Sequence, residues 1–298
     1  MKFDFDTAKK SGYIAISGKP NVGKSTLMNH ILGKKIAITS RKAQTTRQSI
    51  LGIKTVGDTQ MLFIDTPGIH LRKDTQMNQR MNRVAKSTLN EVNLVLFVTD
   101  LTWDEQDKNV LSLMKQLNVP VVLVVNKVDN MNNRELLLPL LAERGEMMSF
   151  EEIIPISALK NQQLQELENI ILSKIPQGMH LYNPDEFTNR SDRFMIAEMV
   201  REKIMRQLGQ EIPYRTAVTV ERLEETARII KVDVLIWVER KGHKNILIGR
   251  QGERLKSIGT QARVDIERHF NKKVLLKSWV KVKENWSDNL DFLNEADL

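Results

Sequence analysis

The sequence predicts an α/β domain, with a mixed but mostly parallel sheet and helices on both faces, followed by a smaller α+β domain. Two patterns lead to this prediction. Short apolar runs alternate with helical stretches up to about residue 178, whereas a helix, two extended segments, further helical stretches and a strand follow it. The length of 298 residues also exceeds that of a typical single domain.

Five apolar runs predict the strands of the first domain. Runs such as LVLFV and VVLVV are apolar throughout, which is typical of strands that are covered on both faces. Because the segments between the runs have a helical period or charge, we expect parallel strands joined by helices. The expected strands are 13–17, 61–64, 94–99, 121–125 and 153–155.

A change of pattern predicts where the second domain begins. Residues 175–190 contain two prolines, a glycine and asparagines, which interrupt both periods. We therefore expect a first domain over 1–178, a linker over 179–190 and a second domain over 191–298. In the second domain we expect the order α-β-β-α-α-β. The expected elements are a helix at 194–208, extended segments at 217–220 and 230–238, helices within 244–270 and a strand at 274–282. The helical stretch is expected to break near Gly249–Gly252 and near Gly259.

The composition excludes several kinds of chemistry and suggests an anionic partner. Without cysteine there can be no disulfide, Cys-ligated zinc, iron–sulfur cluster or thiol catalysis. The lack of long apolar runs and of an apolar N-terminal stretch predicts a soluble cytoplasmic protein. The net charge of +8 is unevenly distributed, because residues 240–283 hold 13 Lys and Arg against three acids, whereas residues 284–298 hold five acids. An ordinary solvated face is the alternative interpretation of the basic block.

The segment GKPNVGKS follows the first expected strand and opens a helical stretch. This is the GxxxxGK[ST] pattern in the context that it requires, where backbone N–H groups wrap phosphates at a helix N-terminus. Lys24 is expected to reach the β- and γ-phosphates and Ser25 to hold Mg²⁺, and the alternative is a glycine-containing turn before a helix. The predicted nucleotide-binding residues are Gly18, Lys19, Pro20, Asn21, Val22, Gly23, Lys24, Ser25 and Thr26.

A second motif, DTPG, follows the expected strand MLFI. An acid at this position, downstream of a phosphate loop, can serve the metal, and the Gly68 N–H can sense a γ-phosphate. Alone the tetrapeptide is a common turn, but its distance from the phosphate loop favours a functional role. The predicted nucleotide-binding residues here are Asp65, Thr66, Pro67 and Gly68.

The tetrapeptide NKVD predicts the choice of guanine over adenine. A carboxylate can accept hydrogen bonds from N1–H and the 2-amino group of guanine together, and a buried acceptor left unpaired costs about 1–3 kcal/mol. We expect Asp129 to select the base, Asn126 to brace the loop and the stem of Lys127 to lie over the purine. A backbone N–H for guanine O6 is expected from the next loop, formed by Ser157, Ala158 and Leu159.

In this order and spacing, GKPNVGKS, DTPG, NKVD and SAL resemble the signature motifs of the translation-factor class of P-loop GTPases. The segment KAQTTR resembles the first switch of that class, in which one threonine closes onto Mg²⁺ and the γ-phosphate. Thr46 is expected to be that residue, and Thr45 is the alternative. The resemblance implies hydrolysis of GTP through Lys24, Thr46 and Gly68, with Mg²⁺ held by Ser25, Thr46 and Asp65.

Two residues depart from the commonest pattern of small GTPases. Ile69 stands where many of them place a water-orienting Gln, and an Ile side chain cannot hydrogen-bond a water molecule. Slow intrinsic hydrolysis is therefore expected. Asn21 stands where some related GTPases hold K⁺ beside the phosphates, so K⁺ is a candidate second cation. The alternative is that Asn21 only forms a turn.

The second domain contains GRQG between two helical stretches. It matches the GxxG loop of KH modules, which approaches a single-stranded nucleic-acid backbone while basic neighbours supply countercharge. A glycine-capped helix pair is the plain alternative, and core packing would equally explain the candidate groove residues Ile246, Ile248 and Leu255. The predicted RNA-binding residues are Lys244, Ile248, Gly249, Arg250, Gln251, Gly252, Arg254 and Lys256.

The second domain resembles a type II KH domain, and a Ras-like GTPase domain followed by such a domain resembles the Era family over essentially the whole chain. The segments VERKGHKNILIGRQGERLKSIGTQARVDIERHF and KSWVKVKENW are similar to that family's C-terminal signature. The resemblance implies a GTP-dependent assembly factor of the 30S ribosomal subunit that binds single-stranded RNA near the 3′ end of 16S rRNA, with peripheral contact to the inner membrane. The segment HLRKDTQMNQRMNR after DTPG is more polar than the usual family pattern.

Two other functions are compatible with the same motifs. GTP could be only a structural ligand of an RNA chaperone, or the GTPase could act on a protein or membrane partner, with the KH fold as a docking surface. In the favoured interpretation, GTP orders the switch segments around 41–47 and 65–85 and thereby changes how the linker presents the KH surface. Core or edge packing is expected of Trp237, Trp279 and Trp286, which alternate with basic residues.

Overall fold

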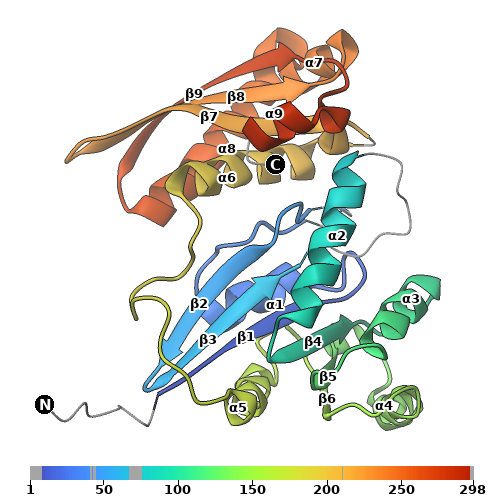
Figure 1. Cartoon of the computed structure of the whole chain (residues 1–298). Coiled ribbons are helices and arrows are strands. Elements are labelled where there is room, and N and C mark those ends of the chain that lie inside the picture. The colour runs from blue at the N-terminus through green and yellow to red at the C-terminus, as the bar shows by residue number, and fades with distance from the viewer. Residues whose placement is uncertain (1–8, 41, 43–44, 67–75, 210, 296–298) are drawn as a thin grey trace, which may run out of the picture. The chain divides into compact units, whose positions relative to one another are not determined.

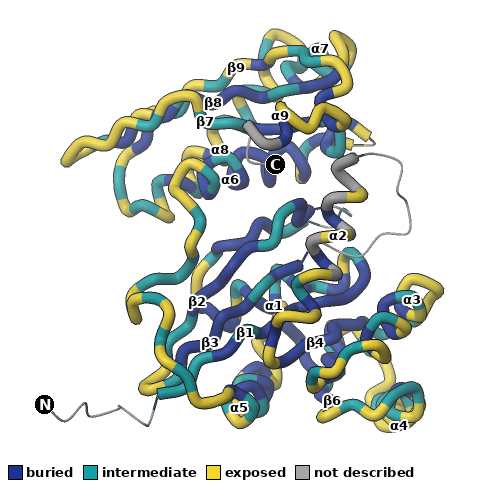
Figure 2. The backbone as a smooth tube through the Cα atoms, in the orientation of Figure 1, coloured by how far each residue is buried: buried dark blue, intermediate teal, exposed yellow. Residues whose placement is uncertain are grey.

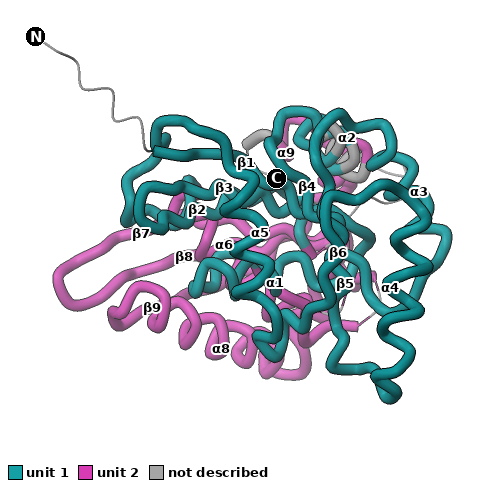
Figure 3. Tube along the Cα trace, turned by 90° about the horizontal axis from the view of Figure 1, so that it is seen from below, with its two compact units in different colours: residues 1–37, 46–72, 80–189 teal, residues 38–45, 73–79, 190–298 magenta. Residues whose placement is uncertain are grey.

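The chain folds into two compact units (Figures 1 and 3). The structure, a computed structural model, describes residues 9–40, 42, 45–66, 76–209 and 211–295. Unit 1 takes its residues from 1–37, 46–72 and 80–189, and unit 2 from 38–45, 73–79 and 190–298. The α/β domain lies in unit 1 and the α+β domain in unit 2, so both predicted fold classes are confirmed.

Unit 1 is built on a six-stranded sheet with the order β2-β3-β1-β4-β5-β6. Strands β3, β1, β4, β5 and β6 run parallel to one another, and β2 pairs antiparallel with β3 at one edge. The predicted strands are all present, whereas β2 has no counterpart among them. The bounds are β1 (Lys10–Ser17), β2 (Ile50–Val56), β3 (Thr59–Asp65), β4 (Leu94–Thr99), β5 (Val121–Val125) and β6 (Glu152–Pro155).

Helices cover both faces of this sheet, and its strands are buried along most of their length (Figure 2). On one face, Leu89 and Met114 belong to one apolar cluster with Phe97 of β4. On the other face α1 packs so closely on β2 that a Cβ added to Gly52 would lie 2.5 Å from Leu32. The helices of the α/β domain are α1 (Lys24–Leu32), α2 (Gln76–Asn90), α3 (Glu105–Met114), α4 (Leu137–Gly145) and α5 (Leu164–Lys174), and the first residues of α2, up to residue 79, are assigned to unit 2.

The segment predicted as a linker is held against strands β2 and β3. The buried Gln60 side chain accepts hydrogen bonds from the N–H groups of Leu181 and Tyr182 and donates one to the Tyr182 carbonyl, over 2.8–3.0 Å. The Ile53 N–H also donates to the Phe187 carbonyl over 2.9 Å. The part of this segment from Leu181 to Phe187 therefore has hydrogen-bond partners in unit 1.

Unit 2 contains a three-stranded sheet with the order β7-β8-β9, in which β7 and β8 are antiparallel and β8 and β9 parallel. The α-β-β-α-α-β order is confirmed. Its elements are α6 (Asp192–Gln207), β7 (Thr216–Glu225), β8 (Ile229–Val238), α7 (Lys241–Ile248), α8 (Glu253–Phe270), β9 (Lys273–Val282) and α9 (Leu290–Glu295). Short 3-10 turns lie at Val128–Asn130, Arg134–Leu136, Ile212–Arg215, Arg250–Gly252 and Trp286–Asp288.

Two expectations for unit 2 are wrong in detail. Helix α8 runs without a break through Gly259, because one glycine costs a helix interior only about 1 kcal/mol and the flanking turns supply good helix formers. Strand β7 extends to Glu225, well beyond the predicted 217–220, because cross-strand pairing with β8 continues past a bulge near Val220. Within the described ranges no helix is both long and apolar enough to cross a bilayer.

Candidate nucleotide and RNA sites

The loop after β1 requires glycine at two positions. Gly18 has a φ of 151°, and a Cβ there would lie 2.2 Å from the Val98 carbonyl oxygen. Gly23 has a φ of 103°, and a Cβ there would lie 2.3 Å from the side-chain nitrogen of Asn126. Both glycines therefore let the loop pass close to neighbouring strands before α1 begins at Lys24.

The Lys24 side chain is folded into this loop. Its Nζ donates hydrogen bonds of 2.9 Å to the Gly18 and Lys19 carbonyls. Burial lowers the pKa of Lys24 to about 8, although the charge of Asp65 acts in the opposite direction. Among the described residues, backbone carbonyls and the carboxylate of Asp65 compensate this buried cation, and such a cation is well suited to meet a phosphate group.

Three side-chain oxygens from separate segments form the candidate metal site. The Ser25 hydroxyl donates to Asp65 Oδ2 over 2.6 Å, and the Thr46 hydroxyl lies 3.0 Å from Ser25 Oγ and donates to the same carboxylate oxygen over 3.2 Å. Asp65 Oδ1 is buried and has no hydrogen-bond partner among the described residues. Burial raises the pKa of Asp65, although Lys24, Ser25 and Thr46 oppose the shift. A cluster of hard oxygens with an unused buried carboxylate oxygen fits Mg²⁺.

The two candidate threonines of the first switch have different hydrogen-bond partners. Thr46 lies with Ser25 and Asp65, whereas the Thr45 hydroxyl donates to the Lys42 carbonyl over 2.6 Å and lies 2.8 Å from Ser40 Oγ. Thr66 is buried and its hydroxyl donates to the Ile16 carbonyl, which ties the start of DTPG to β1. Three residues to which the sequence assigns roles lie outside the described residues: Pro67, Gly68 and Ile69.

Asn126 connects the three loops that would surround a nucleotide. Its side-chain nitrogen donates to the Val22 carbonyl in the phosphate loop over 2.7 Å. Its Oδ1 accepts hydrogen bonds from the N–H groups of Lys127 and Ala158 over 2.8 and 2.9 Å. With a side chain 2% exposed, Asn126 acts as a fixed brace between the phosphate loop and the two loops that would meet the base.

Asp129 is oriented by a serine from the next loop. The Ser157 hydroxyl donates to Asp129 Oδ1 over 2.6 Å, and Ser157 Oγ accepts from the Lys160 N–H. The Ser157 N–H itself is bound to the Gln162 carbonyl. A guanine O6 would therefore meet the N–H of Leu159 or share that of Ala158, which already donates to Asn126.

A network of acids that the motifs did not single out lies beside these loops. Asp100 follows β4, accepts from Lys127 Nζ over 2.8 Å and from the Thr102 hydroxyl over 2.7 Å, and lies 3.9 Å from Lys19 Nζ. Burial favours the neutral form of Asp100, but the Lys127 and Thr102 hydrogen bonds outweigh it, so the pKa of this carboxyl is lowered. The usable sequence signal is an acid directly after a buried strand, the same signal that identified Asp65.

Lys19 belongs to this network through its side chain. Its Nζ lies 2.6 Å from the fully buried Asp107 and 3.0 Å from Asp104 at the start of α3. The Asp104 side chain accepts from the Gln106 and Asp107 N–H groups, and its own N–H donates to Asp107 Oδ2, which completes a capping box. In this structure the side chain of Lys19 thus anchors the phosphate loop to α3, while its carbonyl accepts from Lys24.

The GxxG loop between α7 and α8 adopts a backbone that favours glycine. Gly249 and Gly252 have φ values of 74° and 80°, and Gln251 between them has a φ of 51°. A Cβ on Gly249 would lie 2.8 Å from Arg254 Cβ, whereas one on Gly252 would meet nothing within 4 Å. Arg254 donates to the Ile246 carbonyl over 2.6 Å, so its guanidinium also closes the end of α7.

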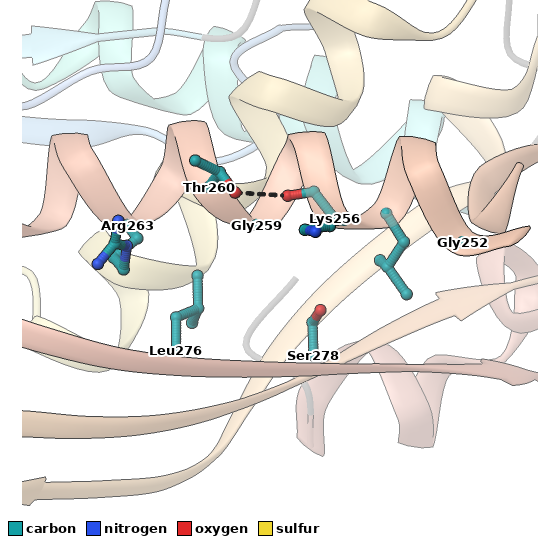
Figure 4. A pocket seen from close by; sticks show the side chains of 8 residues that line it. Gly252, Lys256, Gly259, Thr260, Arg263, Leu276 and Ser278 are labelled. Carbon is teal, nitrogen blue, oxygen red and sulfur yellow. Dashed lines mark hydrogen bonds between the residues drawn. The ribbon is translucent and has the colours of Figure 1, made fainter.

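A cavity of about 340 Å³ lies directly beside this loop, between α8 and β9 (Figure 4). Leu276 and Ser278 point into it from β9, and α8 supplies mainly small and basic side chains. Of the predicted RNA-binding residues, Gly252 and Lys256 line the cavity, and Lys244, Ile248, Gly249, Arg250, Gln251 and Arg254 do not. The lining residues are Gly252, Leu255, Lys256, Gly259, Thr260, Arg263, Leu276 and Ser278.

The groove candidates named from the sequence have separate places. Leu255 lines the cavity, whereas Ile246 is 46% exposed and Ile248 half-buried on α7. The sequence did not identify Gly259 and Arg263 as lining residues. Both lie farther along α8 from the loop, and because the helix was predicted to break near Gly259, the sequence could not show which residues share one face of it. The arrangement of a glycine loop, a basic helix and an open cavity can hold a short single-stranded segment with its phosphates at the loop.

Comparisons with known proteins give a match for each of the two domains. Residues 13–127 match the protein family described as 50S ribosome-binding GTPase, and residues 211–287 match the KH domain family. The GTPase Era of Marinobacter nauticus is 52% identical over 281 residues, which cover 94% of this chain and 92% of that protein. The GTPase Era of Coxiella burnetii is 49% identical over 284 residues, covering 95% and 96% of the two chains.

Solved structures of the same kind of protein superpose on nearly the whole chain. A crystal structure of Era in complex with MgGDPNP and nucleotides 1506–1542 of 16S ribosomal RNA has a TM-score of 0.93 and 38% identity, covering 97% of this chain and 98% of that one. A point variant of Aquifex aeolicus Era bound to GDP.AlF4- has a TM-score of 0.92 and 38% identity, covering 96% and 98%. With relatives of about half-identical sequence over almost their full length, this chain belongs to the Era family of GTPases.

Proposed function

We propose that this protein is a GTP-binding and GTP-hydrolysing switch that binds 16S rRNA of the small ribosomal subunit and assists assembly of the 30S subunit. The observation that supports the proposal is that one chain combines a candidate nucleotide site and a candidate RNA site. Unit 1 gathers a phosphate loop, three metal-directed oxygens and a braced acid for guanine, and unit 2 presents a GxxG loop beside an open cavity. The related Era structure with MgGDPNP and rRNA nucleotides supports the same pairing of ligands.

The residues of the chain divide the catalytic work by position. Backbone N–H groups between Gly18 and Gly23 would surround the phosphates, and Lys24 would add positive charge at the transferred group. Ser25, Thr46 and Asp65 would hold Mg²⁺, which supplies charge neutralisation on the phosphates when bound. Sensing of the γ-phosphate by the Gly68 N–H remains part of this proposal.

A second cation is proposed beside the phosphates. Asn21 has a φ of 66° at the exposed tip of the phosphate loop, a backbone conformation that asparagine and glycine adopt most readily. The conformation alone would explain an asparagine here, and a K⁺ ligand would explain its amide oxygen. The two roles can be separated by measurement, because a glycine at this position would keep the backbone conformation and remove the amide oxygen.

The location of the protein is a further part of the proposal. We propose a cytoplasmic protein with peripheral contact to the inner membrane, as the family resemblance implies. Flotation of the full chain with vesicles of anionic lipid, with and without GTP, tests the membrane contact. A protein that stays with the aqueous fraction in both nucleotide states would contradict it.

The nucleotide function is tested by changing the base-selecting acid. In Asp129→Asn the amide presents a donor where guanine also has a donor, so affinity for GTP should fall at least about 100-fold while xanthosine triphosphate gains affinity. Isothermal titration with GTP, ATP and xanthosine triphosphate measures the three affinities. Unchanged preference in the variant, or a preference of the wild-type protein for ATP, would contradict the proposal.

The RNA function is tested at the position in the GxxG loop that has room for a side chain. Gly252→Asp places a negative charge where phosphates would lie, without a steric contact within 4 Å. Binding of single-stranded RNA from the 3′ end of 16S rRNA should be lost while GTP turnover is retained. Gly252→Asn is the matched control, because it places a side chain of the same size at the same φ of 80° without adding a charge. Equal RNA binding by Gly252→Asp and wild type would favour a protein or membrane partner instead.

A further inference from the structure

The two faces of strand β9 have different surroundings. Val274 and Val280 are buried, and Leu276 and Ser278 line the cavity against α8. The alternate residues of the same strand point to the opposite side of the sheet, because successive side chains of a strand alternate. These residues are all exposed along the whole strand: Lys273, Leu275, Lys277, Trp279 and Lys281.

Trp279 is the exception to the expectation that the tryptophans of this domain serve packing. Trp286 is fully buried, and Trp237 packs on Phe292 with ring centroids 5.3 Å apart. Trp279, in contrast, is 48% exposed, and Leu275 on the same face is 45% exposed. A large flat apolar ring is therefore left accessible in a strand that lies at the edge of the sheet.

The charges around Trp279 are mostly positive. Lys277 and Lys281 stand two residues away on the same strand and face, and register places Lys231 of β8 beside Leu275. Among the described residues no carboxylate pairs with Lys231, Lys273 or Lys277. Asp233 beside Lys277 is the acid that β8 contributes to this face, and Glu224 of β7 is paired with Arg222 over 2.6 Å.

We propose that the exposed face of β9, with Trp279 as a stacking platform and Lys277 and Lys281 as phosphate contacts, is a second binding surface for single-stranded RNA. The proposal rests on the RNA-binding function proposed above. Single-stranded nucleic acids bind where an accessible aromatic ring meets a base while nearby cations track the backbone, and this surface supplies both at alternate positions of one strand. Strand β9 lies at the edge of the sheet and also lines the cavity. A single-stranded RNA bound in the cavity can therefore continue over the exposed face of β9.

The acids of the C-terminal segment favour RNA over an anionic membrane. Segment α9 packs on Trp237 through Phe292, and Asp288 and Asp291 beside it are exposed. A planar anionic membrane lying on the sheet would meet these acids together with the lysines. A single strand of RNA can follow β9 alone and avoid them.

The experiment compares two RNA lengths on the full chain with GTP analogue bound. One oligonucleotide has about four nucleotides, the number that a GxxG loop clamps, and the other has about ten with the same core. Trp279→Ala should weaken binding of the longer RNA about tenfold and leave that of the shorter RNA unchanged. Trp279→Phe should restore most of the loss, since a ring that can stack is retained.

Two further variants separate stacking from charge. Lys277→Gln should reduce the dependence of log Kd on log salt for the longer RNA by about 0.7, the contribution of one released phosphate contact. Leu275→Ala is the matched control, because it removes an exposed apolar side chain from the same face without a ring, and it should bind both RNAs like wild type. Binding of the shorter RNA, which requires a folded unit 2, should be the same in all variants, and so should GTP turnover in unit 1.

The outcomes distinguish this proposal from the one on which it rests. If the wild-type protein binds both RNAs and Trp279→Ala binds the longer one as tightly as wild type, the surface on β9 is overturned while the RNA function stands. If the wild-type protein binds neither RNA, both proposals fail. If Trp279→Ala loses binding to anionic lipid vesicles and not to RNA, the face is a membrane surface and the proposal is wrong.

Discussion

Ser157 donates its hydroxyl hydrogen to Asp129 Oδ1 over 2.6 Å. This bond joins the two loops that follow β5 and β6, and it fixes one oxygen of the acid expected to select guanine. Asn126 joins the same two loops through the Ala158 N–H and reaches the phosphate loop through the Val22 carbonyl. The base-selecting acid is therefore positioned before any nucleotide arrives, which reduces the ordering that binding requires.

Removing the Ser157 hydroxyl should weaken nucleotide binding without changing the base that is preferred. In Ser157→Ala, Asp129 keeps its charge but loses a neighbour that orients it, and hydrogen bonds to half-exposed charged groups contribute about 1 kcal/mol. We expect GTP and GDP to bind about five- to tenfold more weakly, with kcat unchanged because the phosphates are not touched. Stopped-flow measurement of fluorescent-nucleotide dissociation checks this.

The control for this prediction is Ser173→Ala, which removes a hydroxyl bound to a helix carbonyl on the exposed side of α5. It should bind both nucleotides like wild type. A Ser157→Ala variant with wild-type dissociation rates would show that the bond to Asp129 has no part in nucleotide affinity.

The contrast between Asp65 and Asp100 shows how far the sequence alone predicts this site. Both acids stand at the carboxyl end of a buried strand, Asp65 as its last residue and Asp100 directly after it. The DTPG motif identified Asp65 because the motif lies downstream of the phosphate loop. The role of Asp100 depends on Lys19 and Lys127, which reach it from distant parts of the sequence. Periodicity and motif spacing locate strands and loops, but they do not determine which side chains meet across two loops.

The fold shows the same limit. The buried strands β4 and β5 were predicted with their observed bounds because continuous apolar runs indicate strands that are covered on both faces. Strand β2 was missed because Gly52 and Lys54 interrupt its apolar pattern. Its glycine is required by packing, since Leu32 of α1 occupies the space of a side chain there. That requirement is visible only once α1 and β2 lie together.

Nucleotide affinity should fall as pH rises above about 8, the pKa to which burial lowers Lys24. Phosphate beside Lys24 favours the charged amine, so the pKa of Lys24 in the complex must be higher than in the free protein. Between those two pKa values binding takes up a proton, and affinity falls by up to about tenfold per pH unit. Titration calorimetry of GDP binding in buffers of different ionisation enthalpy measures this proton uptake.

The matched variant for the pH prediction is Lys24→Arg. A guanidinium does not titrate in this range, so its affinity should follow only the titration of guanine itself. The folding stability of the nucleotide-free protein should change with pH in the opposite direction. The pKa of Lys24 is about 8 in the folded protein and 10.5 in the unfolded chain, so between these values the unfolded chain binds more protons. The free energy of unfolding should therefore rise with pH in this range. Identical pH profiles for wild type and Lys24→Arg would contradict the lowered pKa.

Potassium should accelerate GTP hydrolysis if the Asn21 amide is a cation ligand. We expect a higher kcat in KCl than in NaCl at equal ionic strength, by about tenfold, since one well-placed charge at the transferred phosphate stabilises the transition state by about 1.4 kcal/mol. In Asn21→Gly the loop can keep its φ of 66° without strain, but the amide oxygen is gone, so the difference between the two salts should disappear.

The control for the potassium prediction is Asn271→Gly. Asn271 also has a positive φ, of 50°, at the end of α8, so it tests the same substitution outside the phosphate loop. It should keep the full potassium effect. Equal rates of the wild-type protein in the two salts would leave Asn21 with the role of a turn former.

Helix α6 holds the first switch segment, and this contact should couple the nucleotide to RNA binding. Glu202 accepts from the Thr39 N–H over 3.0 Å, and Arg206 donates to the Thr39 hydroxyl over 3.1 Å. Arg201, 1% exposed, donates to the Thr45 carbonyl. Residue 46 is the expected metal ligand, so a change there reaches α6 through the adjoining residues of the chain. We therefore expect the switch segment itself, rather than the linker alone, to be a route between the two sites.

Arg206→Met should reduce this coupling and leave each site intact. Its side chain is half exposed, so the variant should fold, but it can no longer donate to Thr39. We expect the ratio of RNA affinities with GTP analogue and with GDP to fall toward one, from a wild-type ratio of about 5–150, which is the range of coupling free energies of about 1–3 kcal/mol. Nucleotide affinity without RNA should remain that of wild type.

Arg134→Met, on an exposed turn of unit 1, is the control and should keep the ratio. Arg201→Lys keeps a charge beside Glu198 but cannot maintain the bonds of Arg201 to both Glu198 and Thr45. An unchanged ratio in both Arg206→Met and Arg201→Lys would mean that the bonds from α6 to Thr39 and Thr45 carry no signal.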